Sequence, residues 1–166
     1  MLNRVLVPLD GSALAETAID YALQVVKPNG ALTLVSAIQV PEYPIYDLYP
    51  VPMPTPHSNE GADKAIPGAK SYLERVADRL RETTQLEVSI VVDIGDPAAL
   101  IVDVAEHDNV DAIVMSTHGR SGLTRWFFGS VTSKVLMGAQ RPVFVIPAKN
   151  RQHLEEAQSD PAAATT

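Results

Sequence analysis

The sequence predicts an α/β protein whose core is an open sheet of five parallel strands with helices on both faces. Two observations lead to this prediction. Short runs rich in Val, Ile and Leu alternate with segments in which apolar residues recur every three or four positions. The short runs are almost continuously apolar, which is typical of strands that are buried on both faces of a parallel sheet.

The first strand and the first helix occupy the start of the chain. Residues 4–8 are a mostly apolar run that ends at the turn-forming sequence Asp10-Gly11-Ser12. Ser12 is the expected N-cap of the following helix, and the Pro-Asn-Gly sequence at 28–30 is expected to end it. Residues 31–38 are the predicted second strand. The apolar face of the helix is expected to comprise Leu14, Ala18, Tyr21 or Ala22, and Val25.

Residues 41–67 differ in character, because seven prolines and three tyrosines fall within them. Proline removes a backbone donor and interrupts helices and central strands. We therefore predict a Pro-rich insertion on the surface, lying across a ligand cleft or against a partner. Segments rich in Pro and Tyr also act as peptide ligands, so a protein partner that binds residues 41–67 is a second interpretation.

A second helix is predicted from Gly68 to about Thr83. Charged residues cover one of its faces, which is simplest to interpret as exposed to solvent. Residues 86–94 are the predicted third strand. The apolar face of the helix comprises Tyr72, Leu73, Val76 and Leu80.

The remaining elements continue the alternation. Asp96 is expected to cap a helix that has Pro97 at its first position. A strand at 112–117, a helix from about Val131 to residue 137 or 139, and a strand at 142–147 follow. We predict one domain over residues 1–148 and a flexible, polar, Ala-rich C-terminal tail over residues 149–166.

The composition argues against several classes of function. The formal net charge is −7, whereas binding to nucleic-acid phosphates needs a basic surface. There is no cysteine, which excludes disulfides and thiolate chemistry within the chain. No run approaches the ~20 apolar residues of a membrane span, and no signal peptide precedes the first strand. We expect a cytoplasmic protein with no nucleic-acid or membrane partner.

A glycine-rich segment connects the fourth strand to the last helix. It begins at Ser116 and contains Gly119, Gly122 and Gly129 before Ser130. Backbone N–H groups in such a loop converge, and the helix N-terminus adds partial positive charge, which suits an anion such as phosphate. A flexible connection without a ligand is the alternative interpretation.

The predicted fold gives this loop a context. Ligands of open α/β sheets bind beyond the carboxyl ends of the strands, where the strand order reverses. The first strand ends near Asp10, the second near Ala37 and the fourth near Met115, so these ends line one crevice if the first and fourth strands are neighbours. Taken alone, Asp10 is a turn-forming residue and Met115 is a core residue.

Three signatures in the right order resemble the universal stress protein family. Residues 7–12 resemble its first strand and turn, and Gly95-Asp96-Pro97 with residues 111–115 resemble its middle section. Residues 118–131, followed by Arg141-Pro142-Val143, resemble its closing section. The likeness covers about residues 2–147. It implies a Rossmann-like sheet of the adenine nucleotide alpha hydrolase-like type, with strand order 3-2-1-4-5.

The ATP-binding branch of that family carries the motif Gly-x2-Gly-x9-Gly-Ser/Thr. Gly119, nine intervening residues and Gly129-Ser130 match it, whereas Ser116 stands in place of the first glycine. Serine still offers its backbone N–H and adds a hydroxyl, although a positive φ or a close phosphate at that position would favour glycine. The resemblance implies ATP as the ligand, accompanied by Mg²⁺ or Mn²⁺.

The resemblance also implies roles for single residues. Asp10 would face the ribose or a phosphate-bound metal ion, and Pro8 and Ala37 would frame the adenine or the ribose. Met115 would pack on the base. The backbone around Gly129 would cradle the phosphates, with Arg120 either pairing with them or solvated. The complete set is Pro8, Asp10, Ala37, Met115, Ser116, Gly119, Arg120, Gly122, Gly129, Ser130 and Val131, with Asp10 as the metal ligand.

No motif for efficient catalysis is present. The P-loop pattern Gly-x4-Gly-Lys-Ser/Thr is absent, so we interpret Lys134 as a surface residue and His118 as a structural donor. Neither a metal-binding histidine spacing nor a Gly-x-Ser-x-Gly elbow occurs. No catalytic residue is predicted.

Three functions are compatible with these features. The first is a homodimeric ATP-binding switch in a stress response, the second is a slow ATPase or autokinase, and the third acts through protein contacts without ATP. Residues Val143–Ile146, expected at a sheet edge, would form the dimer by antiparallel pairing, as the resemblance implies.

Overall fold

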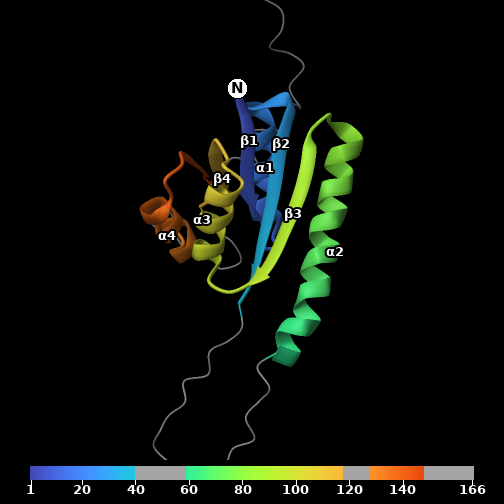
Figure 1. Ribbon diagram of the computed structural model, residues 1–166, viewed down its shortest axis with the longest axis vertical. Helices are drawn as coiled ribbons and strands as arrows, with labels where there is room; N and C mark the ends of the chain where they lie inside the picture. The colour runs from blue at the N-terminus through green and yellow to red at the C-terminus, as the bar shows by residue number, and fades with distance from the viewer. Residues whose placement is uncertain (40–58, 118–127, 148–166) are drawn as a thin grey trace, which may run out of the picture.

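The computed structural model describes residues 1–39, 59–117 and 128–147. Strands and helices alternate along most of these ranges (Figure 1). The elements are, in order, β1 Leu2–Pro8, α1 Ala13–Val25, β2 Val26–Ile38, α2 Asn59–Thr83, β3 Glu87–Ile94, α3 Pro97–His107, β4 Ala112–Ser116, α4 Ser130–Gly138 and β5 Val143–Ile146.

The strands in the described part of the chain form one parallel sheet in the order β3-β2-β1-β4-β5. This confirms the predicted fold class and strand order. β1 is central, because Val5 pairs with Leu32 of β2 on one side and with Ala112 of β4 on the other. The strand order reverses between β1 and β4, so their carboxyl ends are neighbours, as the predicted crevice requires.

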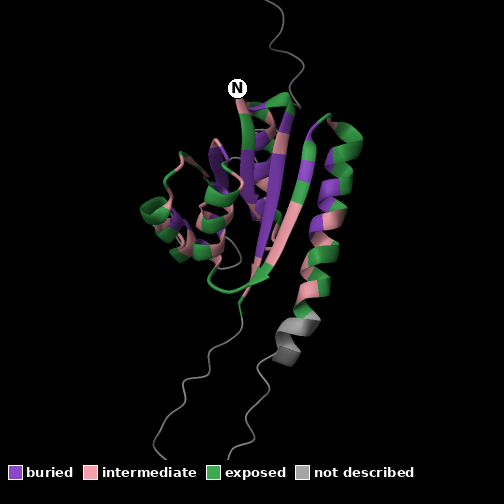
Figure 2. Cartoon of the chain, viewed as in Figure 1, coloured by how far each residue is buried: buried purple, intermediate pink, exposed green. Residues whose placement is uncertain are grey.

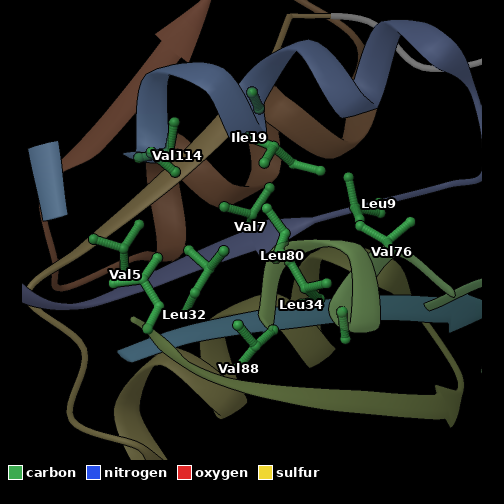
Figure 3. Packing of buried hydrophobic residues seen from close by; sticks show 14 of the residues in the cluster. Val5, Val7, Leu9, Ile19, Leu32, Leu34, Val76, Leu80, Val88 and Val114 are labelled. Carbon is green, nitrogen blue, oxygen red and sulfur yellow. The ribbon is translucent and has the colours of Figure 1, made fainter. Parts of the chain in front are cut away.

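Apolar side chains fill both faces of the sheet. Val5 and Val7 of β1 pack with α1 and α2, whereas Leu6 packs with α3 and α4. All three are fully buried. Figure 2 shows that burial follows the central strands and the sheet-facing side of α2, and Figure 3 shows the cluster around Val7. The predicted cover of helices on both faces is confirmed.

The predicted helix caps are confirmed. The backbone N–H of Ala15 donates to Ser12 Oγ at 3.1 Å, and Asp96 Oδ1 accepts from two backbone N–H groups of α3, each at 3.0 Å. Pro97 occupies the first turn of α3. The buried stripe of α1 differs from the prediction, because small side chains let the helix approach the sheet. It comprises Ala15, Ala18, Ile19 and Ala22.

β2 begins earlier than predicted, at Val26, and includes the Pro-Asn-Gly sequence at 28–30. Leu2 pairs with Val26 and Arg4 pairs with Ala31, so β2 carries extra residues there and departs from regular pairing. A Cβ at Gly30 would lie 2.7 Å from the Asn3 carbonyl oxygen, so this close approach requires glycine. Residues 28–30, which were expected to form a turn, are therefore part of the strand.

α2 also begins earlier than predicted, at Asn59, with Pro67 inside the helix. The prediction that the Pro-rich insertion extends to residue 67 without a helix is wrong for residues 59–67. Proline removes one helical hydrogen bond, but its fixed φ suits a helix, so a long helix tolerates it at a cost. Residues 40–58 and the predicted tail at 149–166 lie outside the described residues. Among the described helices, none has the length and apolarity needed to cross a membrane.

Candidate functional site

A cleft of about 710 Å³ lies at the carboxyl ends of β1, β2 and β4. Its walls also include residues of α1, α2 and the N-terminal turns of α3 and α4. The volume falls within the range of small-molecule sites, roughly 300–1,000 Å³. The predicted crevice is therefore present, at the point where the strand order reverses.

The predicted site residues that the structure describes all line this cleft. Gly119, Arg120 and Gly122 lie outside the described residues. The others come from three strand ends and from one helix N-terminus, so segments distant in sequence converge. They are Pro8, Asp10, Ala37, Met115, Ser116, Gly129, Ser130 and Val131.

Asp10 forms the turn after β1 and also lines the cleft. Its Oδ1 accepts hydrogen bonds from the backbone N–H of Ser12 at 3.0 Å and from Ser12 Oγ–H at 2.6 Å, which holds the turn. Gly11 has a φ of 83°, a conformation that favours glycine. Asp10 is also the one charged side chain among the described residues that line the cleft.

The first turn of α4 is joined to the end of β4. The Gly129 N–H donates to the Thr117 carbonyl at 3.0 Å. The hydroxyl of buried Thr132 donates to the carbonyls of Ser116 and Thr117, at 3.3 and 3.2 Å. Sequence reasoning missed Thr132, because a threonine near a helix start has no distinctive signal. These bonds fix the helix N-terminus at the mouth of the cleft.

The three helices that begin at the cleft differ in their caps. Ser12 caps α1, and Asp96 caps α3, whose first turn also contains Pro97 with no N–H. α4 starts after Gly129, which has no side chain to supply a cap. Within the described residues, the N–H groups of 130–132 have no hydrogen-bond acceptor. Such N–H groups, with the helix dipole behind them, are suited to an anion.

An apolar wall faces the same cleft. Met115, Val35 and Ile101 are buried and belong to the core cluster beneath α3 and α4, and all three also line the cleft. Met115 is thus both a core residue and part of the cleft. Polarizable and aliphatic side chains of this kind pack well against flat rings.

α2 supplies a wall that sequence reasoning did not assign to the site. Tyr72 lines the cleft, and its hydroxyl donates to Glu16 Oε1 of α1 at 2.9 Å. Arg79 binds the other oxygen of Glu16 at 3.0 Å. Burial, followed by the bond to Glu16, raises the pKa of Tyr72. The apolar helix pattern accounted for Tyr72 as a core residue and could not reveal its partner.

Lys134 is not among the described residues that line the cleft. Lys134 Nζ donates to Asp96 Oδ2 at 2.7 Å, and its side chain is more than half exposed, which agrees with its interpretation as a surface residue. This hydrogen bond lowers the pKa of Asp96. In the described ranges, no group of three or more His, Cys, Asp or Glu side chains is arranged to hold a metal ion.

The reversed strand order and the cleft beyond the strand ends define an open α/β protein with its site at the topological switch point. Residues 1–147 match the universal stress protein family, and the chain belongs to this family. The resemblance found in the sequence is thereby confirmed.

Individual relatives agree with this assignment. Universal stress protein MJ0577 of Methanocaldococcus jannaschii is 29% identical over 160 residues, covering 90% of this chain and 98% of the relative. A solved MJ0577 structure superposes with a TM-score of 0.73 over 89% of this chain and 97% of that one. Putative universal stress protein SAUSA300_1656 of Staphylococcus aureus is 30% identical over 168 residues, covering 99% and 93%.

A more distant solved structure shares the fold. It is described as a universal stress protein in complex with cAMP, with 20% identity and a TM-score of 0.62. The likeness covers 89% of this chain and 98% of that one.

Proposed function

We propose that this chain binds an adenine nucleotide, ATP, in the cleft and acts as a regulatory switch in a stress response. The observation that carries the proposal is the uncapped first turn of α4, where residues 130–132 line the cleft and their N–H groups have no acceptor in the described chain. A phosphate group satisfies such donors and is stabilised by the helix dipole.

The other walls suit the remaining parts of the ligand. The apolar wall around Met115 offers packing surface for adenine, while Pro8 and Ala37 frame the base or the ribose. Arg120 is proposed as a further phosphate ligand. The cAMP bound by the distant relative supports an adenine nucleotide as the ligand class.

A magnesium ion fits the site only in company with phosphates. The described lining contains one carboxylate, Asp10, and Mg²⁺ is commonly held by one or two carboxylates plus substrate phosphates and water. Asp10 is the residue that would hold it, and the ion would offset the charge of the triphosphate. Mn²⁺ fits the same oxygen ligands.

We further propose a cytoplasmic homodimer formed through β5. This strand is at one edge of the sheet, and Phe144 on it is 43% exposed. An exposed apolar edge strand is suited to pairing with a second copy. Protein contacts through residues 41–67 remain part of the proposal.

A slow autokinase is the second candidate. The observation that favours it is the exposed hydroxyl of Ser130 at the first position of α4, beside the proposed phosphates. Transfer would form a bond between Ser130 Oγ and the γ-phosphorus and break the bond from that phosphorus to the bridging oxygen. ADP would leave and the hydroxyl proton would pass to water, and the described lining offers no histidine or lysine to accelerate the step.

Calorimetry tests the proposal directly. We expect saturable heat when ATP is added with Mg²⁺ and little or no phosphate release from the same sample. Folded protein that gives no heat with ATP would contradict nucleotide binding and leave function through protein contacts. Phosphate release, or a phosphorylated Ser130 found by mass spectrometry, would favour the second candidate.

A further inference from the structure

Tyr72 lies in the wall of the cleft that α2 forms. This wall offers a hydrogen-bond acceptor, whereas the first turn of α4 offers N–H donors. α2 packs on β2 and β3, on the same face of the sheet as α1. The neighbours of Tyr72 in this wall are small, and they leave room for a ligand. They are Ala65, Gly68 and Ala69.

The hydrogen of the Tyr72 hydroxyl is already used. Glu16 accepts it at 2.9 Å, and Arg79 holds the second oxygen of Glu16 at 3.0 Å. The carboxylate is therefore fixed between two donors. A phenol hydroxyl has one hydrogen to donate, so Tyr72 presents only oxygen lone pairs to a further partner.

Asp10 presents a second acceptor to this region. Both residues line the same cleft, and the charge of Asp10 is one of the causes that raise the pKa of Tyr72, after burial and Glu16. An ionised carboxylate accepts hydrogen bonds and donates none. Two acceptors in one cleft suit a ligand with two neighbouring donors, such as the vicinal hydroxyl groups of ribose.

The arrangement of the walls favours the sugar over the base at this place. The apolar wall of Met115, Val35 and Ile101 belongs to the opposite face of the sheet and suits adenine. Asp10 follows β1, which neighbours β4, and α4 begins beyond the end of β4. The ribose is the part of a nucleotide that is joined to both the phosphates and the base.

We propose that Tyr72, held in place by Glu16, accepts a hydrogen bond from a ribose hydroxyl of the bound nucleotide and makes α2 the sugar-recognition wall. This inference rests on the proposed nucleotide function. It assigns Tyr72 as a specificity-determining residue that the glycine motif does not include.

The test compares ATP, 2′-deoxy-ATP and 3′-deoxy-ATP by calorimetry on wild type and Tyr72→Phe. Phenylalanine keeps the ring and removes the hydroxyl group, and with it the hydrogen bond to Glu16. We expect wild type to prefer ATP over both deoxynucleotides, by about three- to tenfold for the hydroxyl that Tyr72 accepts, the range of one neutral hydrogen bond. Tyr72→Phe should bind ATP more weakly by a similar factor, lose the preference against one deoxynucleotide and keep the preference against the other.

Tyr21→Phe is the matched control, because Tyr21 packs partly buried on α1 and does not line the cleft. It should keep the wild-type preference for ribose. Wild type that binds ATP, with Tyr72→Phe retaining the same preference or weakening all three nucleotides equally, overturns the inference alone. Wild type that binds no ATP overturns the proposed function and the inference together.

Discussion

The hydrogen bonding of polar groups differs between the two ends of the sheet. At the amino ends of the strands, Asp111 Oδ2 accepts the backbone N–H groups of Asn3 and Arg4. Arg4 in turn donates to the Asp108 carbonyl at 3.0 Å. At the carboxyl ends, the described lining has one charged side chain and a helix turn without acceptors in the described chain.

This difference separates groups that stabilise the fold from groups available to a ligand. Polar groups at the amino end are bonded within the chain, so their loss should lower the free energy of unfolding. At the carboxyl end, the N–H groups of residues 130–132 have no acceptor in the described chain, so changes at this turn of α4 should lower affinity and leave stability nearly unchanged. Substitutions at the two ends test whether affinity and stability separate in this way.

The largest expected effect is that of Gly129→Asp at the carboxyl end. A carboxylate at the start of α4 would repel the phosphates, and two unit charges about 4 Å apart near a protein surface interact by about 4 kcal/mol. We expect ATP affinity measured by calorimetry to fall by at least about 100-fold. The melting temperature should stay close to that of wild type.

Gly138→Asp is the charge-matched control. Gly138 is the last residue of α4, and an added Cβ there meets only Val102 Cγ2 at 3.7 Å, an ordinary contact. This variant adds the same charge at the far end of the same helix. Equal loss of affinity in both variants would argue that net charge, rather than the α4 N-terminus, governs binding.

The α2 wall provides a steric test of intermediate size. A Cβ at Gly68 has no atom within 4 Å, and Gly68 lines the cleft. Gly68→Leu should fill space needed by the ligand and weaken ATP binding by about tenfold or more. Gly68→Ala should bind ATP much as wild type does and raise the free energy of unfolding by roughly 0.5–1 kcal/mol. Undiminished affinity in Gly68→Leu would place the ligand away from α2.

The smallest effect is expected at the amino end, for Asp111→Ala. Hydrogen bonds from the backbone N–H groups of Arg4 and Asn3 lower the pKa of Asp111 from its ordinary value of 3.8. We expect the variant to lose about 1 kcal/mol of unfolding free energy at neutral pH and no ATP affinity.

The pH dependence of that loss follows from the sign of the shift. A lowered pKa in the folded state gives stability above pH 3.8, and this stability disappears as the pH falls through the lowered value. Urea unfolding of wild type and variant should therefore converge in acid. A difference that persists well below that pH would contradict the role assigned to the Asp111 carboxylate.

Much of the fold was predictable, because apolar runs and helix caps are local signals. The caps Ser12 and Asp96 were read directly from turn chemistry, and the third strand was predicted within one residue of its observed start. The predicted starts of β2 and α2 were wrong, because Gly30 lies within an irregular strand and Pro67 lies within a helix. The strand order came from family resemblance, because periodicity does not record which strands are neighbours.

The position of residues at the cleft was predictable where they lie at the ends of strands. Asp10 and Met115 stand at strand ends, and such ends meet at one edge of a parallel sheet. Tyr72 was not predictable as a cleft residue, because its partner Glu16 is 56 positions away and on another helix. Contacts of that kind depend on how the helices pack, and a single sequence carries no local signal for them.

The most direct measurement is the change in backbone amide chemical shifts when ATP and Mg²⁺ are added. The central claim is that the first turn of α4 binds the phosphates. It predicts large shifts for the amides of Ser130, Val131 and Thr132, and none at Asn3 and Arg4 at the opposite end of the sheet. Saturable ATP binding that leaves the three α4 amides unmoved would contradict the claim.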